Sequence, residues 1–507
     1  MEIEFKFEVP AQRFKAVEKE LRALAAKAAR KHMQAHYFDT EGGTLAAHGV
    51  ALRLRKEGRR WVQTAKALGD GPLHRLEHNV DLTHTGAGHP EVDAQRHAGS
   101  AVGDLLDKLL EHGEVPLVET FGTDIWRLAC IHQSGDTTVE FALDVGKVMT
   151  PPRDGDDGRT SPVCELEIEL IDGDVATLVA LAHEWSQRHG LWFSTVSKAE
   201  RGQRLCDGQA SAKAVKASPT KFAHEHGHDV SGAIIQRTVL AACLAHVLPN
   251  ASEVAAGNED IEVVHQLRVG IRRTRTALRE LDALAPASLD PAWEAPLVEA
   301  FRVLGASRDR ELLLGAMQPR LEAAGAPSVD LGPGEDAHSP PIGDAVRSPA
   351  FQAALVSMTG FAASTPDEAP NEEQGTSPHR QLQKQLNKLH KQLTQDGKHF
   401  ESLDSDAQHR VRKRIKRLRY LADFVAPLFG KADAERYIAS LVPAQDALGE
   451  FNDEVVAMAA YRDAAERDPR AWFAVGWLSA LKPAKARACR KCLGQLAKAR
   501  KFWKKDG

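Results

Sequence analysis

The sequence has little cysteine, few aromatic residues and no long apolar run. Its 507 residues include six scattered cysteines, and aromatic side chains make up 6%. Scattered cysteines are typical of reduced thiols, and the Cys489/Cys492 pair lacks the second pair that a zinc site would need. The first residues lack the basic flank and apolar core of a secretory signal, and no run of about 18 apolar residues appears. We therefore expect a cytoplasmic protein with no membrane partner.

The charge is unevenly distributed along the chain. The net charge of −4 divides into 25 Lys and Arg against 33 Asp and Glu in residues 1–210, and 41 against 37 in the remainder. With 43% hydrophobic and 27% charged residues, the composition is that of a globular protein with about two to four folding units. The two parts therefore differ in electrostatic character, and the second is the more basic.

Two basic segments of the second part repeat each other. The first reads HQLRVGIRRTRTALREL from His265, and the second reads HRVRKRIKRLRYLADF from His409, 144 residues later. The same 144 residues separate LGASRDRE at Leu304 from LGEFNDEV at Leu448. This constant register indicates an internal duplication of a helical unit. Because the cations recur at helical spacing, the duplication favours a polyanionic ligand.

The hydrophobic periodicity predicts an α+β protein. In the first part, period-two alternation indicates strands, and the alternating residues are often charged, which favours an antiparallel tunnel or barrel with a polar interior. Helical patterns interrupt the strands at residues 11–30, 99–112 and 174–188. An all-α part of two duplicated helical bundles follows. We predict a tunnel domain at 1–206, a linker at 207–228 and a helical domain at 229–507, the last comprising repeat one at 229–324, a loop-rich insert at 325–378 and repeat two at 379–507.

Charged residues on the predicted strands indicate a metal and phosphate site. Glu2, Glu4 and Lys6 alternate along one strand and therefore share a face, as do the glutamates of ELEIE at 165–169. Crowded carboxylates repel one another unless a cation compensates, and the hard ions Mg²⁺ and Mn²⁺ are the usual compensators. Either strand alone fits a solvated sheet face equally well. Arg53 and Arg55 share a face of a third strand, and such cations bind phosphoryl oxygens.

A series of motifs in the first 200 residues resembles the CYTH domains, the triphosphate tunnel metalloenzymes. The motifs are ExExK at 2–6, YFDT at 37–40, ALRLR at 51–55, the strand with Lys66, RLE at 75–77, a strand ending at Arg127, VEFALDVG at 139–146, ELEIE at 165–169 and SKAERG at 197–202. Relatives often have a further carboxylate where this chain has Asn79, which makes a second metal the less certain part of the comparison.

The CYTH resemblance implies a closed antiparallel tunnel and assigns roles to individual residues. It implies a divalent metal held by Glu2, Glu4, Glu167 and Glu169, with Glu165 in support. It implies a triphosphate bound by Lys6, Arg53, Arg55, Lys66, Arg75, Arg127 and Lys198. The implied catalytic set is Glu4, Lys6, Lys66, Glu77 and Asp144, and Glu77, Glu140 and Asp144 are candidates for binding a second metal or positioning water.

The second part resembles the CHAD family, the conserved-histidine α-helical domains. The resemblance implies binding of inorganic polyphosphate by His265, Arg268, Arg272, Arg273, Arg275, His409, Arg412, Lys416, Arg417 and Arg419. An ordinary solvated basic face would have interspersed glutamates, and residues 268–279 and 410–419 contain none. The two histidines lack a nucleophile or metal-ligand partner at suitable spacing, which favours an anion-contacting or structural role. Nucleic acid is the rival polyanion, but only Tyr420 and Phe424 could stack on bases, so we expect no specific nucleic-acid partner.

These observations predict a metal-dependent inorganic triphosphatase with a polyphosphate-binding helical domain. The expected cofactor is Mg²⁺ or Mn²⁺, and the expected partners are inorganic triphosphate and polyphosphate. One alternative is a binding protein associated with polyphosphate granules, with little catalytic turnover. Another is a CYTH enzyme that acts on an organic triphosphate, either thiamine triphosphate or ATP in a cyclisation.

Overall fold

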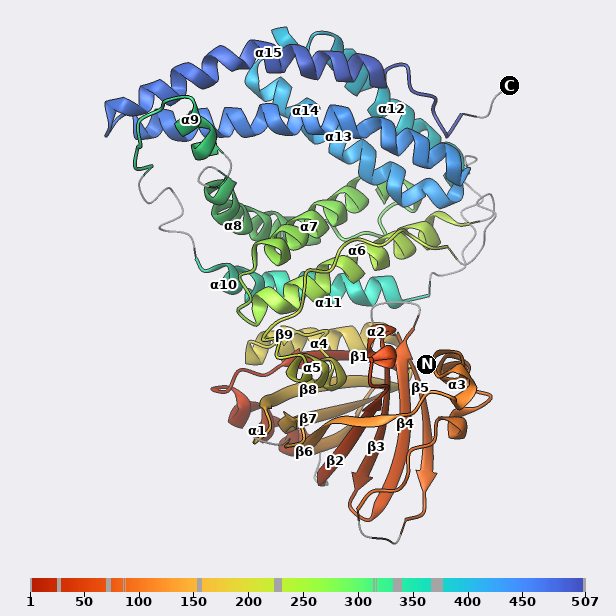
Figure 1. Cartoon of the computed structure of the whole chain (residues 1–507). Helices are drawn as coiled ribbons and strands as arrows, with labels where there is room; N and C mark the ends of the chain where they lie inside the picture. The colour runs from red at the N-terminus through yellow and green to blue at the C-terminus, as the bar shows by residue number, and fades with distance from the viewer. Residues whose placement is uncertain are drawn as a thin grey trace. The chain divides into compact units, whose positions relative to one another are not determined.

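The computed structural model forms two compact units, each described here by itself (Figure 1). The sheet unit comprises Met1–Lys216, Leu244–Gln266 and Val346–Thr365, and the helical unit comprises Ala217–Cys243, Leu267–Ala345 and Pro366–Gly507. The structure describes residues 2–24, 29–69, 74–84, 86, 88–152, 157–222, 230–312, 315, 317–331, 340–365 and 377–504. For residues 2, 29, 68, 74, 75 and 306–312 it describes the backbone alone.

The sheet unit is built around a closed antiparallel sheet. The strands run in the order β5-β4-β3-β2-β6-β7-β8-β1-β9, and a further pairing of β5 with β1 closes the ring. All the strand pairings are antiparallel. The strands are β1 (Glu2–Glu8), β2 (Ala29–Asp39), β3 (Val50–Glu57), β4 (Arg60–Leu68), β5 (His74–Leu82), β6 (Val118–Ser134), β7 (Thr137–Met149), β8 (Thr160–Asp172) and β9 (Trp192–Phe193).

Alternation along each strand gives the sheet a polar inner face and an apolar outer face. On β1, Glu4 and Lys6 line internal cavities, whereas Phe5 and Phe7 are fully buried on the other face. On β7, Phe141 packs against Trp185 of α4 (Val175–His189), with ring centroids 4.9 Å apart. The other helices of residues 1–216 are α1 (Phe14–Leu24), α2 (Thr44–Ala47), α3 (Ala101–Leu109) and α5 (Lys198–Cys206). The apolar residues thus stabilise the wall and leave the charged ones inside.

Two later segments of the chain complete the sheet unit. Residues 244–266 supply the second part of α6 (Gly232–Ala255) and the start of α7 (Ile261–Leu281), and α11 (Pro349–Ala363) packs against α4. The approach of α11 requires a glycine, because a Cβ on Gly360 would lie 2.1 Å from Cγ2 of Val179. Residues 212 and 215, within the predicted linker, hydrogen-bond through their backbone nitrogens to Glu253 and Asn250 of α6.

The helical unit has its core between the second repeat and parts of the first. Leucines of α12 (Pro378–Lys398), α13 (Ser405–Val425), α14 (Lys431–Ala464) and α15 (Trp472–Leu496) form this core with Val239, Ala277 and Leu281. The remaining helices are α8 (Glu294–Leu312), α9 (Gln318–Ala323) and α10 (Ile342–Arg347), the last belonging partly to each unit. Among the described residues, α6 alone is apolar and long enough to span a membrane, and 56% of that apolar window is buried. A buried core helix passes the same test.

Arginines at equivalent positions of the two repeats form reciprocal ion pairs within the helical unit. Arg273 of α7 pairs with Asp423 of α13 at 3.4 Å, and Arg417 of α13 donates through Nε to Glu280 of α7 at 2.6 Å. Arg273 and Arg417 are 144 residues apart, as are the two histidines that begin the repeats. Glu280 is buried, so removing Arg417 would leave an uncompensated charge in the core. These two pairs hold the duplicated helices against each other.

The predicted α+β class and the antiparallel tunnel followed by helices are confirmed. The predicted helix at 11–30 is too long, since α1 ends at Leu24 and residues 29–30 already belong to β2. The strand predicted to end at Arg127 continues to Ser134. The predicted loop-rich insert contains α10 and α11, and its residues 332–339 and 366–376 lie outside the described part. The predicted linker has no helix or strand over residues 209–222.

Two buried histidines make stability depend on pH. His97, which accepts from Gln63 Nε2 at 2.9 Å, and His390, beside the Tyr437 hydroxyl at 2.9 Å, have pKa values lowered by burial from 6.5 to about 4. Between these pH values the unfolded chain binds more protons than the folded protein, so stability falls as the pH is lowered. Each histidine contributes up to about 1.4 kcal/mol per pH unit.

We expect urea unfolding near pH 5 to show lower stability than near pH 7, and the substitution His97→Gln to reduce this difference. His112→Gln is the matched control, because the His112 side chain is 84% exposed. An equal pH dependence of the wild-type protein and His97→Gln would show that His97 does not carry the effect.

Candidate active site

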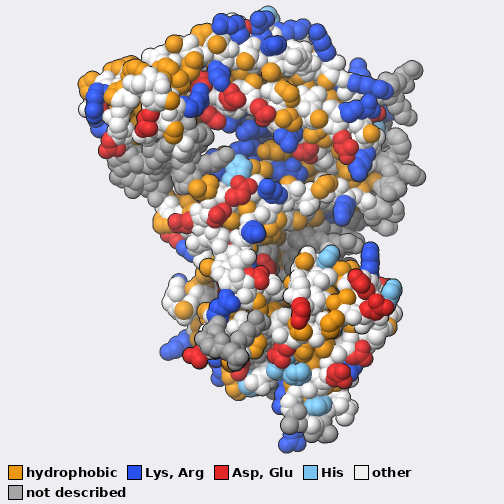
Figure 2. Space-filling model, viewed as in Figure 1, with side chains coloured by type: hydrophobic (Ala, Val, Ile, Leu, Met, Phe, Trp, Pro, Cys, Tyr) orange, Lys and Arg blue, Asp and Glu red, His pale blue; other side chains and the backbone are white. Residues whose placement is uncertain are grey.

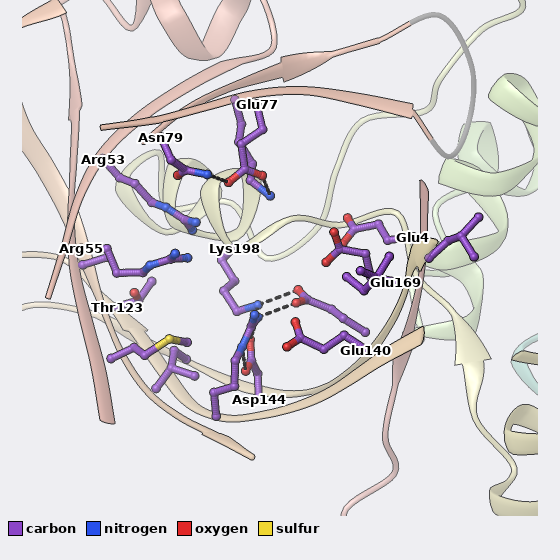
Figure 3. A pocket seen from close by; sticks show the side chains of 18 residues that line it. Glu4, Arg53, Arg55, Glu77, Asn79, Thr123, Glu140, Asp144, Glu169 and Lys198 are labelled. Carbon is purple, nitrogen blue, oxygen red and sulfur yellow. Dashed lines mark hydrogen bonds and ion pairs between the residues drawn. The ribbon is translucent and has the colours of Figure 1, made fainter. Parts of the chain in front are cut away.

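The closed sheet of the sheet unit encloses a charged cavity of about 540 Å³ (Figure 3). Its wall is formed by β1 to β8 together with the first residue of α5. Carboxylates and basic side chains point into it from different sides (Figure 3). Its lining includes Glu4, Arg53, Arg55, Lys66, Glu77, Asn79, Thr123, Arg127, Glu140, Asp144, Glu167, Glu169 and Lys198.

Three carboxylates converge on one side of the cavity. Glu4 of β1 and Glu169 of β8 are directly paired across the two strands, and Glu140 of β7 is paired with Glu169 on the other edge of β8. We call these three the acidic cluster, and Figure 3 shows them together. No ion pair joins any of them to a basic group among the described side chains. Burial, followed by the charge of Glu4, raises the pKa of Glu169 to about 6. Without a direct ion-pair partner among the described side chains, the cluster suits a hard divalent ion.

Two adjacent arginines lie across the cavity from the acidic cluster (Figure 3). Arg53 donates to the Tyr37 hydroxyl at 3.2 Å, and Arg55 is paired with Glu57 at 2.6 Å. Burial, followed by the charge of Arg53, lowers the pKa of Arg55 to about 10. Two half-buried guanidinium groups that repel each other are stabilised by an anion between them. Their planar donors match phosphoryl oxygens.

Lys198 joins a second group of carboxylates at the base of the cavity. Its amine contacts Asp144 at 2.7 Å and Glu167 at 3.0 Å, and it also pairs with Glu165. Arg127 forms a two-point contact with Asp144 at 2.6 and 2.7 Å and also pairs with Glu167. Burial alone would raise the pKa of Glu167, but the charges of Lys198 and Arg127 hold it well below its usual range. Burial instead raises the pKa of Glu165.

Lys66 and Glu77 form an ion pair between neighbouring strands β4 and β5. Asn79 donates to Glu77 Oε1 at 2.8 Å and accepts from the Thr64 hydroxyl at 2.7 Å. Asn79 therefore orients Glu77. A carboxylate there would repel Glu77 unless a cation lay between them.

Residues of the later segments hold the strand that leads to Lys198. The backbone nitrogen of Thr195 donates to the Ser252 hydroxyl at 3.0 Å, and that of Phe193 donates to Gln352 Oε1 at 2.7 Å. Ser252 and Gln352 are buried. Val196, which follows Thr195, accepts a hydrogen bond through its carbonyl oxygen from Lys6 Nζ at 2.5 Å. Ser197 then caps α5, which begins at Lys198. Helices α6 and α11 thus support two of the cationic side chains of the site.

Substituting Ser252 with Ala should lower turnover by about 3- to 10-fold, because one supporting hydrogen bond contributes about 1 kcal/mol. Steady-state kinetics on the folded variant measure this effect. Ser186→Ala is the matched control, since Ser186 is equally buried and its hydroxyl bonds only within α4. If both variants keep full turnover, Ser252 is not needed to position the site.

A second cavity of about 450 Å³ shares residues with the first. Its lining includes the cations Lys6, Arg53, Lys66 and Lys198 and the apolar or aromatic side chains of Tyr37, Leu52, Phe121 and Phe193. An apolar surface beside cations suits a ligand that carries an organic group on a phosphate chain. Lys6, predicted to bind substrate, lines this second cavity and not the first.

The structure brings most of the predicted tunnel residues together. Glu4, Glu169, Arg53, Arg55, Lys66, Glu77, Arg127, Asp144, Glu167 and Lys198 all line the charged cavity. The side chains of Glu2 and Arg75 lie outside the described part of the structure. Glu165 is fully buried behind Lys198. Glu140, predicted as a candidate for binding a second metal or positioning water, belongs to the acidic cluster. Strand alternation with Asp144 was the signal that could have placed it there.

The predicted polyphosphate residues lie on α7 and α13 with partners from neighbouring helices. Arg275 pairs with Glu294 at 3.1 Å, and Arg419 donates to Gln445 at 2.6 Å. Arg268 and Arg272 lie over the Phe301 ring at 5.0 and 5.2 Å. Lys416 and Arg412 are half-buried, and His409 is exposed. His265 is half-buried in the part of α7 that belongs to the sheet unit.

Acidic side chains neutralise more of the positive charge on α7 and α13 than the sequences of the two basic segments indicate. Glu280 and Asp423 lie near the ends of the basic segments and Glu294 lies on α8, all beyond the stretches 268–279 and 410–419 that contain no glutamate. Figure 2 likewise shows Asp and Glu interspersed among Lys and Arg over α12 to α15. The net basic character of this surface is therefore smaller than we expected.

Comparison with known proteins identifies both parts of the chain. The CYTH domain model matches residues 1–203, and the CHAD domain model matches residues 238–462. The chain is a CYTH domain followed by a CHAD domain. The resemblance inferred from the motifs is thus confirmed for both parts of this CYTH–CHAD protein, while the predicted boundaries at 206 and 229 stay predictions.

Individual relatives match parts of the CYTH–CHAD chain. An inorganic triphosphatase of Haemophilus influenzae is 27% identical over 175 residues, which cover 33% of this chain and 44% of that protein. The chain therefore spans less than half the length of this curated relative. The CHAD domain from the plant Ricinus communis is 27% identical and covers 56% of this chain and 97% of its own, with a TM-score of 0.43. A putative adenylyl cyclase from Hippeastrum, described as having a dominant triphosphatase activity, is 16% identical and covers 41% and 97%, with a TM-score of 0.28.

Proposed function

We propose that the protein is a metal-dependent inorganic triphosphatase that hydrolyses triphosphate to diphosphate and phosphate. The observation that carries the proposal is the separation of charge in the cavity. An acidic cluster without a basic partner among the described side chains faces two half-buried arginines that repel each other. A metal–triphosphate complex supplies both missing charges at once. The curated relative named as an inorganic triphosphatase supports this choice of substrate.

The residues suit hydrolysis by charge stabilisation and positioning. A water molecule attacks the terminal phosphorus, the bridging P–O bond breaks, diphosphate leaves, and a proton passes to solvent. Arg53 and Arg55 hold phosphoryl oxygens, and Lys66, held by Glu77, is placed to do the same. Glu4, Glu140 and Glu169 would hold Mg²⁺ or Mn²⁺, which supplies charge neutralisation at the phosphoryl oxygens when bound. Glu167 also lines the cavity, but it would have to release its ion pairs with Lys198 and Arg127 before it could bind the ion.

A screen of phosphate release from several substrates tests the choice of substrate. The substrates are inorganic triphosphate, ATP, thiamine triphosphate and long-chain polyphosphate, each with Mg²⁺ and with Mn²⁺. We expect inorganic triphosphate to have the highest kcat/KM. The apolar part of the second cavity favours an organic triphosphate as the other candidate. A higher kcat/KM with ATP or thiamine triphosphate would select that candidate, and release of diphosphate from ATP would indicate cyclisation.

For the CHAD domain we propose binding of inorganic polyphosphate, in the cytoplasm and at polyphosphate granules. Arg272 and Lys416 occupy equivalent positions of the two repeats and belong to the predicted polyphosphate-binding residues. Nucleic acid is disfavoured because Arg273 lies over the rings of Tyr420 and Phe424 at 5.5 and 4.9 Å. These rings are therefore covered and poorly placed to stack on bases.

We expect the full chain to bind polyphosphate more tightly as the phosphate chain lengthens and more weakly as salt increases, because each contact releases counterions. Arg272→Glu and Lys416→Glu should each lower the affinity by about 10-fold or more. Arg302→Glu is the matched control, since Arg302 is an exposed residue of α8 paired locally with Glu299. Fluorescence anisotropy with labelled polyphosphate measures the affinity. Equal affinity for double-stranded DNA in the same salt, or unchanged affinity of both variants, would refute polyphosphate binding at this surface.

A further inference from the structure

Two histidines and a glutamate meet on the outer face of the sheet, away from the charged cavity. His36 Nδ1 lies 2.7 Å from Glu119 Oε1, and His89 Nε2 lies 3.5 Å from Glu119 Oε2. The two imidazole rings are 4.7 Å apart between centroids. One donor atom from each of the three residues lies within 4.8 Å of the other two. Each side chain is about one third exposed, so an ion from solvent could reach all three.

The fold brings these residues together from three separate segments. On β2, Met33 and Ala35 line the charged cavity, so His36 points to the opposite face. Glu119 lies near the start of β6, which pairs with β2, and the register of this pairing shifts between Tyr37 and Phe38. Such a bulge changes the direction of neighbouring side chains, and here it allows Glu119 to reach His36.

His89 comes from the connection between β5 and the short helix Ala94–His97. Its ring is fixed from two sides. Nδ1 lies 2.8 Å from the carbonyl oxygen of Pro90, and Phe38 contacts the ring edge-on at 5.6 Å between centroids.

The hydrogen bond to Pro90 determines which nitrogen of His89 is free to bind a ligand. A carbonyl oxygen only accepts, so Nδ1 must carry the proton. Nε2 then faces the carboxylate of Glu119, and either a proton or a metal ion between the two atoms satisfies both. Histidines that bind metals characteristically donate their other ring N–H to a backbone carbonyl or carboxylate in this way.

We propose that His36, His89 and Glu119 form a binding site for Zn²⁺ or a similar late transition-metal ion. Two imidazole nitrogens and one carboxylate oxygen form a common zinc ligand set, whereas Mg²⁺ prefers oxygen ligands alone. Tetrahedral coordination leaves a fourth position for water. The donor atoms must move slightly closer together, which rotation of the Glu119 side chain allows. Because the site lies on the other face of β2 from the charged cavity, it is distinct from the proposed triphosphatase metal. Zinc there would hold the connection that contains His89 against β2 and β6.

The experiment titrates the full chain with Zn²⁺, and separately with Co²⁺, in the presence of excess Mg²⁺. Binding of Zn²⁺ is followed by competition with a chromogenic chelator, and nitrogen coordination of Co²⁺ by its visible absorption. The test variants are His36→Ala, His89→Ala and Glu119→Gln. The control is His32→Ala. His32 lies on β2, as His36 does, and pairs with Asp124 of β6 at 2.6 Å. Among the described residues, no second histidine completes a metal cluster there. Circular dichroism verifies that each variant is folded.

We expect one equivalent of Zn²⁺ to bind the wild-type protein and His32→Ala with equal affinity. We expect His36→Ala and His89→Ala to bind it at least about 10²-fold more weakly and to lose the Co²⁺ absorption. Failure of the wild-type protein to bind Zn²⁺ under excess Mg²⁺ would overturn the proposal. So would equal binding by all variants, because the ion would then occupy the carboxylates of the cavity. Neither readout uses turnover, so the result is independent of the proposed triphosphatase activity.

Discussion

Replacing Glu4 with Gln should lower the turnover of inorganic triphosphate by at least about 10²-fold while the protein stays folded. Glu4 belongs to the acidic cluster and has no basic partner among the described side chains, so its charge is available to a metal ion. A neutral amide of the same size keeps the packing but is a much poorer ligand for Mg²⁺ or Mn²⁺. Steady-state kinetics over a range of metal concentrations measure the effect, and Glu140→Gln should behave similarly.

Glu8→Gln provides the control for the Glu4 substitution. Glu8 lies on the same strand and alternates onto the same face, but it pairs with Arg201 and lines neither cavity. We expect this variant to retain its dependence on metal concentration. Full turnover of Glu4→Gln with Mg²⁺ would remove Glu4 from the metal site. An equal loss in Glu8→Gln would indicate a general effect of substitutions in β1.

Replacing Arg53 or Arg55 with Ala should lower kcat/KM for triphosphate by about 10²-fold, through both a higher KM and a lower kcat. The two guanidinium groups repel each other in the ligand-free protein and are relieved by phosphoryl oxygens, so they contribute to binding and to the transition state. Arg55→Lys should recover only part of the loss, because an ammonium group lacks the two-point geometry.

Arg60→Ala is the matched control for the two cavity arginines. Arg60 begins the adjacent strand, is exposed and pairs with Asp81. Its substitution should leave kcat and KM unchanged. Unchanged kinetics in both Arg53→Ala and Arg55→Ala would mean that the triphosphate binds elsewhere, since both side chains line the cavity.

Period-two alternation was the part of the sequence that best predicted the site. It assigned Glu4 and Lys6 to one face of β1, and Arg53 and Arg55 to one face of β3. Both assignments agree with the strand register and the lining of the cavities. The alternation works because the outer face of each strand is apolar and buried, so a shift of one residue would place charges in the core. The fold class could be predicted for the same reason.

The ion pairs within the site could not be predicted from the sequence. Lys198 and Arg127 appear in it simply as basic residues near strands. In the folded protein they contact Asp144 and Glu167, which are distant in sequence. Which carboxylates are neutralised and which are left for a metal depends on these tertiary contacts. Likewise, the sequence of α7 gives no sign that Arg273 pairs with Asp423 of the other repeat. Contacts between distant segments are set by three-dimensional packing, which local periodicity does not encode.

The most direct test of the central claim measures phosphate release from inorganic triphosphate as the Mg²⁺ concentration is raised from zero. Protein and buffers are first freed of divalent ions with a chelating resin. The claim is that the acidic cluster and the arginine pair form one metal-dependent centre for triphosphate hydrolysis. We expect negligible release without metal, a saturable increase with Mg²⁺ or Mn²⁺, and loss of that increase in Glu4→Gln. Release that is equally fast without a divalent ion, or no release from triphosphate at any concentration of either metal, would contradict it.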